Sequence, residues 1–246
     1  VWGEKWFWAP EVYNLNGKFY MFYSAEEKIA VAESSSPLGP FVQSAANKKP
    51  FHESIKEIDT HLFIDDDGKK YLYFVRFTNG NEIWAAELND DLRSIKENTL
   101  IRCFGVSQPW ENSSLEPYPR SKVNEGPFIL KHKGVYYLTY SANHYQNPNY
   151  GVGYATSNSP LGPWKKYDGN PILTGNTKIQ GVGHHSFITV SEGCQYIVYH
   201  SHFSMTAVQP RKLAIDPYEF IPSTIGGHDV LKVYGPTTTP QVLCHK

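Results

Sequence analysis

The sequence lacks the features that mark a nucleic-acid-binding or membrane protein. Lys and Arg number 23 against 24 Asp and Glu, a balance that argues against nucleic acid or an anionic membrane as partner. No apolar run approaches the eighteen or so residues that a membrane-spanning helix needs. The chain begins at Val1 without a recognisable signal peptide, which leaves both a cytoplasmic and a secreted protein open.

Cysteine and helical patterning are also scarce. The three cysteines, Cys103, Cys194 and Cys244, are odd in number and widely spaced, which matches neither a disulfide framework nor a zinc motif. We therefore expect reduced thiols with no functional role. No segment shows the apolar periodicity of a long helix, which excludes a helix-rich fold.

What the sequence does contain is a repeat. Four segments have Gly at the second position of a turn, followed by aromatic and β-branched residues, a pattern typical of β-hairpins. They are NGKFYMFYS from Asn16, DGKKYLYFV from Asp67, KGVYYLTYS from Lys133 and EGCQYIVYH from Glu192. Their glycines are 51, 66 and 59 residues apart, a period that predicts one β-propeller blade per repeat. We expect one all-β propeller domain over residues 1–246, with four blades recognisable.

The strands of these blades follow from the same pattern. The predicted strands are Trp8–Leu15, Lys18–Ser24, Lys28–Glu33, Asp59–Ile64, Lys70–Arg76, Glu82–Leu88, Glu125–His132, Val135–Ser141, Val152–Thr156, His184–Val190, Gln195–His200 and Arg211–Asp216. The segment Cys103–Asn124 is rich in Pro, Ser and Asn. We expect it to form loops over one face, where binding residues usually lie.

The repeat also gives a register for candidate functional residues. Trp8, Asp59, Glu125 and His184 each lie nine residues before a turn glycine, where the preceding strand starts. If those strands are innermost, equivalent positions converge at one mouth of the central channel. An aromatic ring, two carboxylates and an imidazole at one place favour a sugar-cleaving centre.

Several longer segments resemble glycoside hydrolase family 43, the five-bladed propellers that act on arabinofuranosides and xylosides. They are FWAPEVY, IDTHLFIDDDGKKYLYF, NEGPFILKHKGVYYLTYS, VGYATSNSPLGPW, GVGHHSF and GPTTTPQ. The SPLGPF and SPLGPW loops are most similar to the α-L-arabinofuranosidase and β-xylosidase branch. The resemblance implies an inverting glycosidase that removes terminal α-L-arabinofuranosyl or β-D-xylosyl residues from plant polysaccharides.

By this resemblance Glu125 is the general acid, and Asp59 is a further carboxylate that orients it and raises its proton affinity. Inverting hydrolysis needs an acid for the leaving oxygen and a base for the attacking water. The acid must stay protonated near neutral pH, which burial or a neighbouring negative charge achieves. The structural alternatives are a turn-capping role for Glu125 and a bond from Asp59 to its own backbone.

The resemblance also implies substrate contacts and a cation. His184 resembles a histidine near the channel axis that holds a calcium ion, directly or through water, although calcium prefers oxygen ligands. The alternative is a buried His184 that orients a neighbour. Trp8 forms either a wall against the sugar or part of the core. Arg211 either binds a sugar hydroxyl or the catalytic carboxylates, or is solvated. No organic cofactor is expected.

The sequence departs from the family at the general base. The family's base is an Asp in a blade ahead of the WAP segment, which here begins within ten residues of Val1. The closing GPTTTPQ segment has no obvious strand to pair with. A fragment, a second polypeptide that supplies the blade, and a four-bladed ring are all open. A fragment or a two-piece protein is favoured, because an unpaired closing strand would leave exposed edges. We expect poor or no hydrolysis by this chain alone.

Other functions remain as alternatives. A catalytically inactive carbohydrate-binding propeller would keep the aromatic-lined pocket without needing an acid. The related propellers that act on sucrose and fructans are disfavoured, because the chain has Glu125-Gly126-Pro127 and lacks their Arg-Asp-Pro segment. A protein-interaction propeller is less favoured, because it would not require Asp59, Glu125 and His184 at one register.

Overall fold

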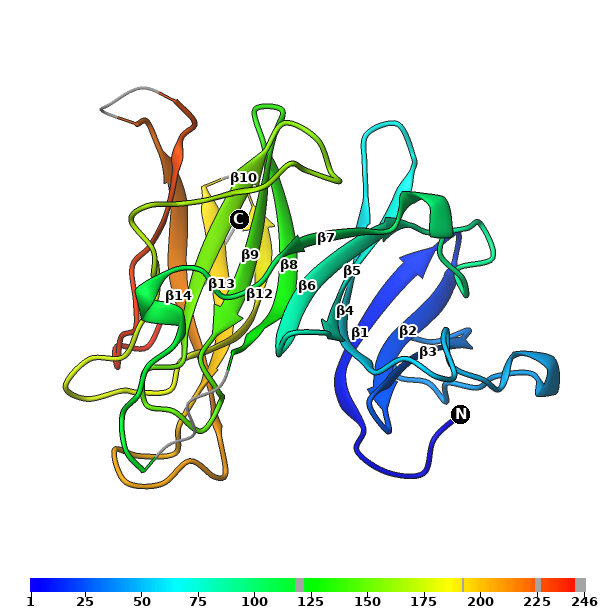
Figure 1. Cartoon of the computed structure of the whole chain (residues 1–246), viewed down its shortest axis with the longest axis horizontal. Coiled ribbons are helices and arrows are strands. Elements are labelled where there is room, and N and C mark those ends of the chain that lie inside the picture. Colours follow the sequence, from blue (N-terminus) through cyan, green and yellow to red (C-terminus); the bar gives the residue numbers. More distant parts are fainter. Residues whose placement is uncertain (118–121, 192, 224–226, 242–246) are drawn as a thin grey trace. The chain divides into compact units, whose positions relative to one another are not determined.

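A computed structural model describes residues 1–117, 122–191, 193–223 and 227–241. Its strands form four antiparallel sheets, each in a propeller-blade arrangement (Figure 1). The sheets contain β1 (Trp8–Leu15), β2 (Lys18–Ala25) and β3 (Lys28–Ser34); β4 (Glu57–Ile64), β5 (Lys70–Phe77), β6 (Asn81–Glu87) and β7 (Ile101–Phe104); β8 (Asn124–His132), β9 (Val135–Ala142), β10 (Gly151–Ser157) and β11 (Lys165–Lys166); and β12 (Gly183–Ser191), β13 (Cys194–Ser201), β14 (Lys212–Ile221) and β15 (Val230–Val233). The predicted all-β propeller class with four blades is confirmed.

The strands predicted from the repeat all form, with ends shifted by a few residues. The outer strands β7, β11 and β15 were not predicted from the sequence. They contain only two to four residues, too few for an alternating pattern to stand out. The described part of the segment expected to form loops does so between β7 and β8, apart from the 3-10 turn η3 (Pro109–Glu111); residues 118–121 lie outside the described residues.

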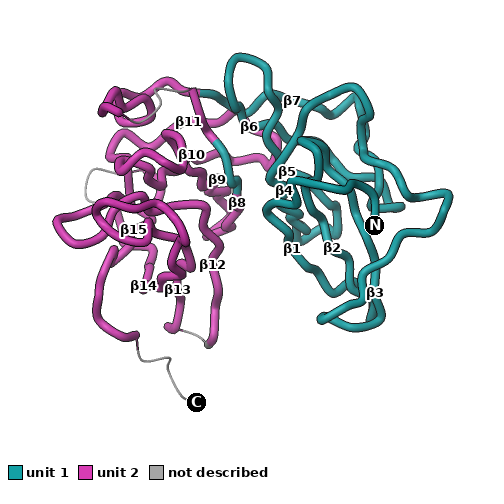
Figure 2. Tube along the Cα trace, turned by 90° about the horizontal axis from the view of Figure 1, so that it is seen from below, with its two compact units in different colours: residues 1–105, 125–127 teal, residues 106–124, 128–246 magenta. Residues whose placement is uncertain are grey.

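The described chain divides into two compact units, coloured separately in Figure 2. Unit 1 contains residues 1–105 and 125–127, and unit 2 contains residues 106–124 and 128–246. The prediction of a single domain stays a prediction. The main core of unit 1 is formed by side chains from its two sheets and the turn after β6: Phe22, Ile29, Val31, Leu62, Leu72, Phe74, Ala86, Leu88, Leu92 and Ile95.

Aromatic side chains make up five of the eleven buried members of the core of unit 2. Its buried members are Tyr137, Val152, Tyr154, Leu173, Val182, Phe187, Ile197, Tyr199, Tyr218, Leu231 and Val233. The many tyrosines of the repeat thus serve mainly as packing residues, with hydroxyls that reach polar partners. Tyr199, for example, donates a hydrogen bond to Asp216, 2.5 Å away.

The closing GPTTTPQ segment has a partner within its own unit. Asp216 on β14 is fully buried and accepts hydrogen bonds from the Thr237 backbone N–H (3.1 Å), the Thr237 hydroxyl (2.5 Å) and the Gln241 amide (3.2 Å). Gly235 packs against this carboxylate so closely that an added Cβ would lie 2.4 Å from Oδ2. A buried carboxylate therefore anchors the segment, an arrangement that strand patterns do not reveal.

The expectation for the cysteines is wrong for Cys194, which forms a disulfide. The spacing of cysteines along the chain does not show which of them the fold brings together. The odd number of cysteines therefore gave a wrong expectation for Cys194. Cys244 lies outside the described residues. None of the helical turns in the described ranges is long and apolar enough to cross a membrane.

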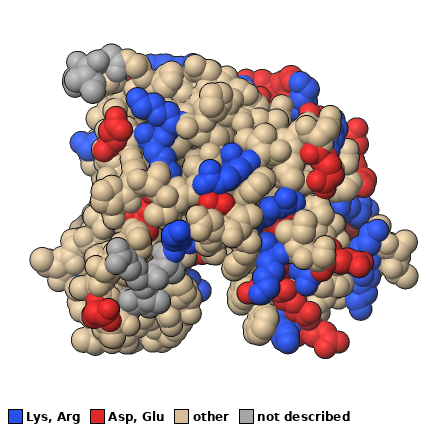
Figure 3. All heavy atoms as spheres, in the orientation of Figure 1, with Lys and Arg blue, Asp and Glu red and all other residues tan. Residues whose placement is uncertain are grey.

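Charged side chains form ion pairs in unit 1. On the face drawn in Figure 3, basic and acidic side chains are interspersed, in keeping with the near balance of the two kinds in the sequence. One chain of pairs involves His52, whose ring nitrogens lie 2.8 Å from Glu57 and 2.9 Å from Glu97. Glu57 also pairs with Arg76 across the β4–β5 ladder, at 2.5 Å.

We predict that His52 makes stability depend on pH. The hydrogen bond to Glu57 is the main cause that raises the pKa of His52, and burial opposes it. A raised pKa gives stabilisation that is complete below the unfolded value of about 6.5 and is lost as pH rises through the folded value. The excess stability of the wild type over His52→Gln, measured by urea unfolding, should therefore shrink between pH 5.5 and pH 8.5. A stability difference between the two proteins that is constant or grows with pH would contradict this prediction. His228→Gln, at an exposed position, is the matched control.

Candidate functional site

A β-bulge lies near the start of the first strand in three of the four described sheets, and it determines where several candidate residues lie. In β1, β4 and β12 the pairing skips at Ala9-Pro10, Asp59-Thr60 and His184-His185, so that two residues face one. The first bulged residue has positive φ in each case: 43° for Ala9, 56° for Asp59 and 47° for His184. Gly126, early in β8, has the same conformation, with φ 55°.

This geometry corrects the predicted common register. Asp59 and His184 occupy the left-handed bulge position, whereas Trp8 and Glu125 each precede it by one residue. Counting nine residues back from the turn glycine gave the wrong register because the turns between the paired strands differ in length. The β1–β2 pairing closes at Leu15 and Lys18, but the β4–β5 pairing closes at Ile64 and Lys70, and β12 has a second irregularity.

The backbone N–H of each left-handed residue needs an acceptor, because a bulge disrupts the ladder. Asp59 donates its N–H to the Ser24 hydroxyl, 3.0 Å away, and His184 donates to the Ser141 hydroxyl, 2.8 Å away. Both serines end a hairpin repeat, a role that the sequence alone did not suggest. Gly126 instead donates to Oδ2 of Asp59, 3.2 Å away.

Unit 1 thus brings Asp59 and Glu125 together. Asp59 is 5% exposed, and its carboxylate contacts the N–H of Gly126, the residue directly after Glu125. Glu125 is half-buried, and its Oε2 accepts a hydrogen bond from Nδ2 of Asn81, 3.3 Å away. Sequence reasoning missed Asn81, which lies directly after the turn glycine Gly80 with no motif around it.

Unit 2 places His184 and Arg211 around a common neighbour, His200. The rings of His184 and His200 stack with centroids 6.5 Å apart, and Nη1 of Arg211 lies 3.3 Å from Nδ1 of His200. Burial, with a further contribution from Arg211, lowers the pKa of His200 to about 2, so its neutral ring accepts from the guanidinium. Exposed Arg211 also lies over the Tyr145 ring, 5.2 Å from its centroid.

A calcium ion at His184 stays a prediction. Within the described ranges, no group of three or more His, Cys, Asp and Glu side chains is arranged to hold a metal ion. His184 has an imidazole as its ring neighbour, whereas calcium prefers carboxylate and carbonyl oxygens. These donors alone do not fit calcium, so an ion there would depend on water ligands.

Trp8 lies at the surface, which excludes the alternative of a core residue. Its side chain is 41% exposed and stacks on Trp6, with centroids 6.1 Å apart and planes 8° apart. Lys5 covers the Trp6 ring at 4.6 Å. An apolar wall against a sugar is consistent with this exposure and stays a prediction.

A second buried carboxylate, Glu111, holds the loop that leads towards Glu125. Glu111 ends the turn η3 and is fully buried. Its Oε2 accepts the backbone N–H groups of Ser107 (2.6 Å) and Gln108 (2.7 Å), as a capping side chain does. The loop therefore closes on its own carboxylate before the chain enters β8.

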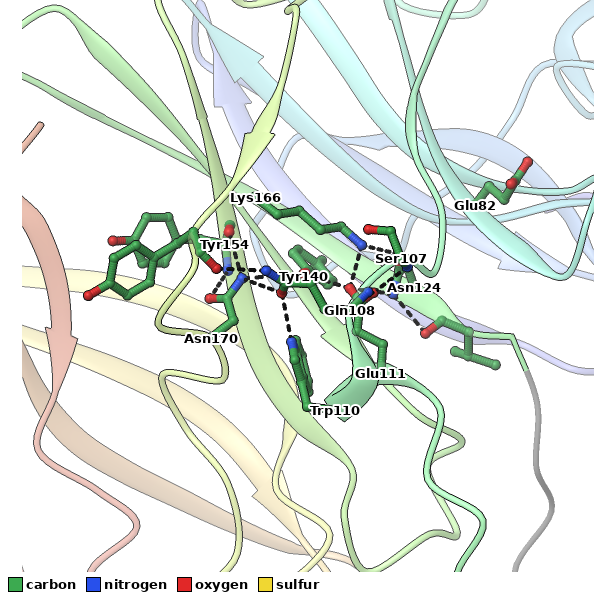
Figure 4. A network of polar contacts seen from close by, with 12 residues as sticks. Glu82, Ser107, Gln108, Trp110, Glu111, Asn124, Tyr140, Tyr154, Lys166 and Asn170 are labelled. Carbon is green, nitrogen blue, oxygen red and sulfur yellow. Dashed lines mark hydrogen bonds and ion pairs between the residues drawn. The ribbon is translucent and has the colours of Figure 1, made fainter. Parts of the chain in front are cut away.

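The other oxygen of Glu111 joins this loop to the sheet, as Figure 4 shows. Glu111 Oε1 accepts from the Tyr140 hydroxyl (2.7 Å), from the Asn124 amide (3.3 Å) and from the Lys166 ammonium. Lys166 also donates to the Asn124 side-chain oxygen at 3.1 Å, and its side chain is only 8% exposed. This buried pair holds Asn124, the residue directly before Glu125.

We predict that Glu111→Ala destabilises the protein strongly. The change breaks the buried ion pair with Lys166 and removes the acceptor of the Ser107 and Gln108 N–H groups. Breaking a buried pair by removing one member costs about 3–5 kcal/mol. Urea unfolding of both proteins measures the difference. Lys18→Ala, which removes a half-exposed partner of Glu33, is the control and should have a much smaller effect. Equal effects of the two changes would contradict the assigned role of Glu111.

Comparison with known proteins identifies relatives along nearly the whole chain. The family model "Glycosyl hydrolases family 43" matches residues 1–223. Among solved structures, an endo-1,4-beta-xylanase from Bacteroides thetaiotaomicron is 48% identical, with a TM-score of 0.86 over 99% of this chain and 80% of that one. The resemblance inferred from the sequence is confirmed.

Two curated relatives share less sequence. The beta-D-galactofuranosidase xynD of Aspergillus niger is 30% identical over 231 residues, which cover 87% of this chain. The xylosidase/arabinosidase 43A of Humicola insolens is 29% identical over 239 residues, which cover 81% of this chain. The chain spans 62% of the length of the first relative and 67% of the second.

Proposed function

The chain belongs to family 43 of the glycosyl hydrolases, and on this basis we propose that the protein is an inverting glycosidase. Its proposed substrates are terminal α-L-arabinofuranosyl or β-D-xylosyl residues of plant polysaccharides. The name of the Humicola insolens relative, a xylosidase/arabinosidase, supports this class of sugar. The observation that carries the proposal is the buried Asp59 carboxylate against the backbone beside Glu125.

In the proposed mechanism, Glu125 protonates the glycosidic oxygen as the bond to the leaving group breaks. A general acid must hold its proton near the working pH, and a neighbouring negative charge favours the protonated form. Asp59 supplies that charge, because the N–H of Gly126 keeps its carboxylate next to Glu125. Trp8 and Arg211 are the proposed sugar contacts.

The acid role predicts a dependence on the leaving group. Glu125→Gln should slow hydrolysis of an aryl β-D-xyloside with a weakly acidic phenol by about 10²–10⁴-fold, the usual contribution of a general acid. The loss should be far smaller for a dinitrophenyl glycoside, whose leaving group departs without protonation. Steady-state kcat/KM values of both proteins on both substrates provide the test. Equal losses on the two substrates would show that Glu125 is not the acid.

The modulating role of Asp59 predicts a shift in the pH profile. Asp59→Asn removes the negative charge but keeps a side-chain oxygen for the Gly126 N–H, and asparagine also tolerates positive φ. Glu125 should then lose its proton at lower pH, so the alkaline limb of kcat/KM should move down by on the order of one unit. A limb that stays in place or moves up in Asp59→Asn would rule out this role.

A further inference from the structure

We propose that Asn81 is a positioning residue that fixes which oxygen of Glu125 carries the proton. This inference rests on the proposed function, since it concerns the same acid. Asn81 opens β6, and its Nδ2 lies 3.3 Å from Oε2 of Glu125. Both residues belong to unit 1, and Asn81 matches no part of the repeat.

The turn before β6 holds Asn81 in a defined place. Asn81 pairs with Phe77 across the β5–β6 ladder, and Thr78 donates its N–H to the Gly80 carbonyl at 3.1 Å. The left-handed Gly80, with φ 86°, lets the chain reverse there. The backbone that carries the Asn81 amide is therefore part of a closed hairpin.

The neighbouring residue, Glu82, strengthens this hairpin. Glu82 is buried and accepts hydrogen bonds from Arg102 on β7 (2.7 Å) and from the Thr78 hydroxyl. The hydrogen bond from Arg102 is the main cause that lowers the pKa of Glu82, so this carboxylate stays charged and paired. Gly105 packs against it so tightly that a Cβ there would lie 2.5 Å from Oε1.

An amide donor beside a carboxylic acid distinguishes its two oxygens. An amide N–H is a donor only, so the oxygen that it contacts must act as an acceptor. In protonated Glu125 the carbonyl oxygen is the better acceptor, so the contact with Asn81 favours Oε2 as the carbonyl oxygen and Oε1 as the oxygen that carries the proton. Glu125 would therefore deliver its proton from one defined oxygen.

Asp59 and Asn81 should act on Glu125 in opposite directions. Asp59, on β4, disfavours the carboxylate form by like charge, whereas the Asn81 amide, on β6, favours that form by donating a hydrogen bond. Glu82, next to Asn81, contributes less because Arg102 neutralises it. Asp59 thus raises the proton affinity of Glu125, and Asn81 lowers it.

The test is a direct titration of the Glu125 carboxyl by carbon-13 NMR, with its signal assigned from its loss in Glu125→Gln. In Asn81→Ala the pKa of Glu125 should rise, by on the order of one unit for a lost donor to a charged group. Asn98→Ala, an exposed site in the turn η2 (Glu97–Thr99), is the matched control and should leave the titration unchanged.

Other outcomes of the titration would overturn the inference. An unchanged pKa in Asn81→Ala would show that the contact with Asn81 does not affect the pKa of Glu125. A lowered pKa would show that the Asn81 carbonyl, not its N–H, faces Glu125. Asn81→Asp preserves the side-chain shape if the alanine variant does not fold, and it should raise the pKa of Glu125 still further; no rise would equally overturn the inference.

The same experiment separates this inference from the proposed function. The titration needs no turnover, so a failure of the leaving-group test on Glu125→Gln would refute the proposed function and leave the Asn81 result standing. With an active wild type, the alkaline limb of kcat/KM should move up in Asn81→Ala, opposite to its movement in Asp59→Asn. A shift of both variants in the same direction would contradict the role given to Asn81.

Discussion

The site depends on the need to satisfy backbone N–H groups that the bulges remove from the ladder. Each described bulge near a strand start holds a residue at positive φ, and an unpaired buried N–H is costly. Ser24 and Ser141 satisfy two of these groups, those of Asp59 and His184, with hydroxyls. Asp59 in turn accepts the N–H of Gly126, which has positive φ in β8. The N–H of Gly126 thereby holds the buried Asp59 carboxyl group against the backbone beside Glu125.

Buried carboxylates are used in two ways in this chain. Glu111 and Asp216 each hold a loop, through backbone N–H groups and side-chain donors, and Glu111 also has the Lys166 ammonium as counter-ion. Asp59 likewise accepts a backbone N–H, but from Gly126, the residue directly after Glu125. Because like charges disfavour joint ionisation, the Asp59–Glu125 arrangement is suited to proton transfer, whereas the other two stabilise structure.

Much of the fold could be predicted from the hairpin repeat, and parts of the site could not. The long strands follow from alternating residues after turn glycines, whereas β11 has only two residues and shows no pattern. Bulges and turn lengths change register without changing composition, so counting from the glycines misplaced Trp8 and Glu125 by one position. Asn81, Glu111 and His200 gain their roles from contacts between distant segments, which one sequence does not display.

The most direct test of the central claim is the anomer first released from an aryl β-D-xyloside and an aryl α-L-arabinofuranoside, followed by proton NMR. In an inverting mechanism Glu125 protonates the leaving group while a separately activated water attacks the sugar. The sugar of inverted configuration should therefore accumulate before mutarotation. Initial release of the retained anomer would contradict the inverting mechanism.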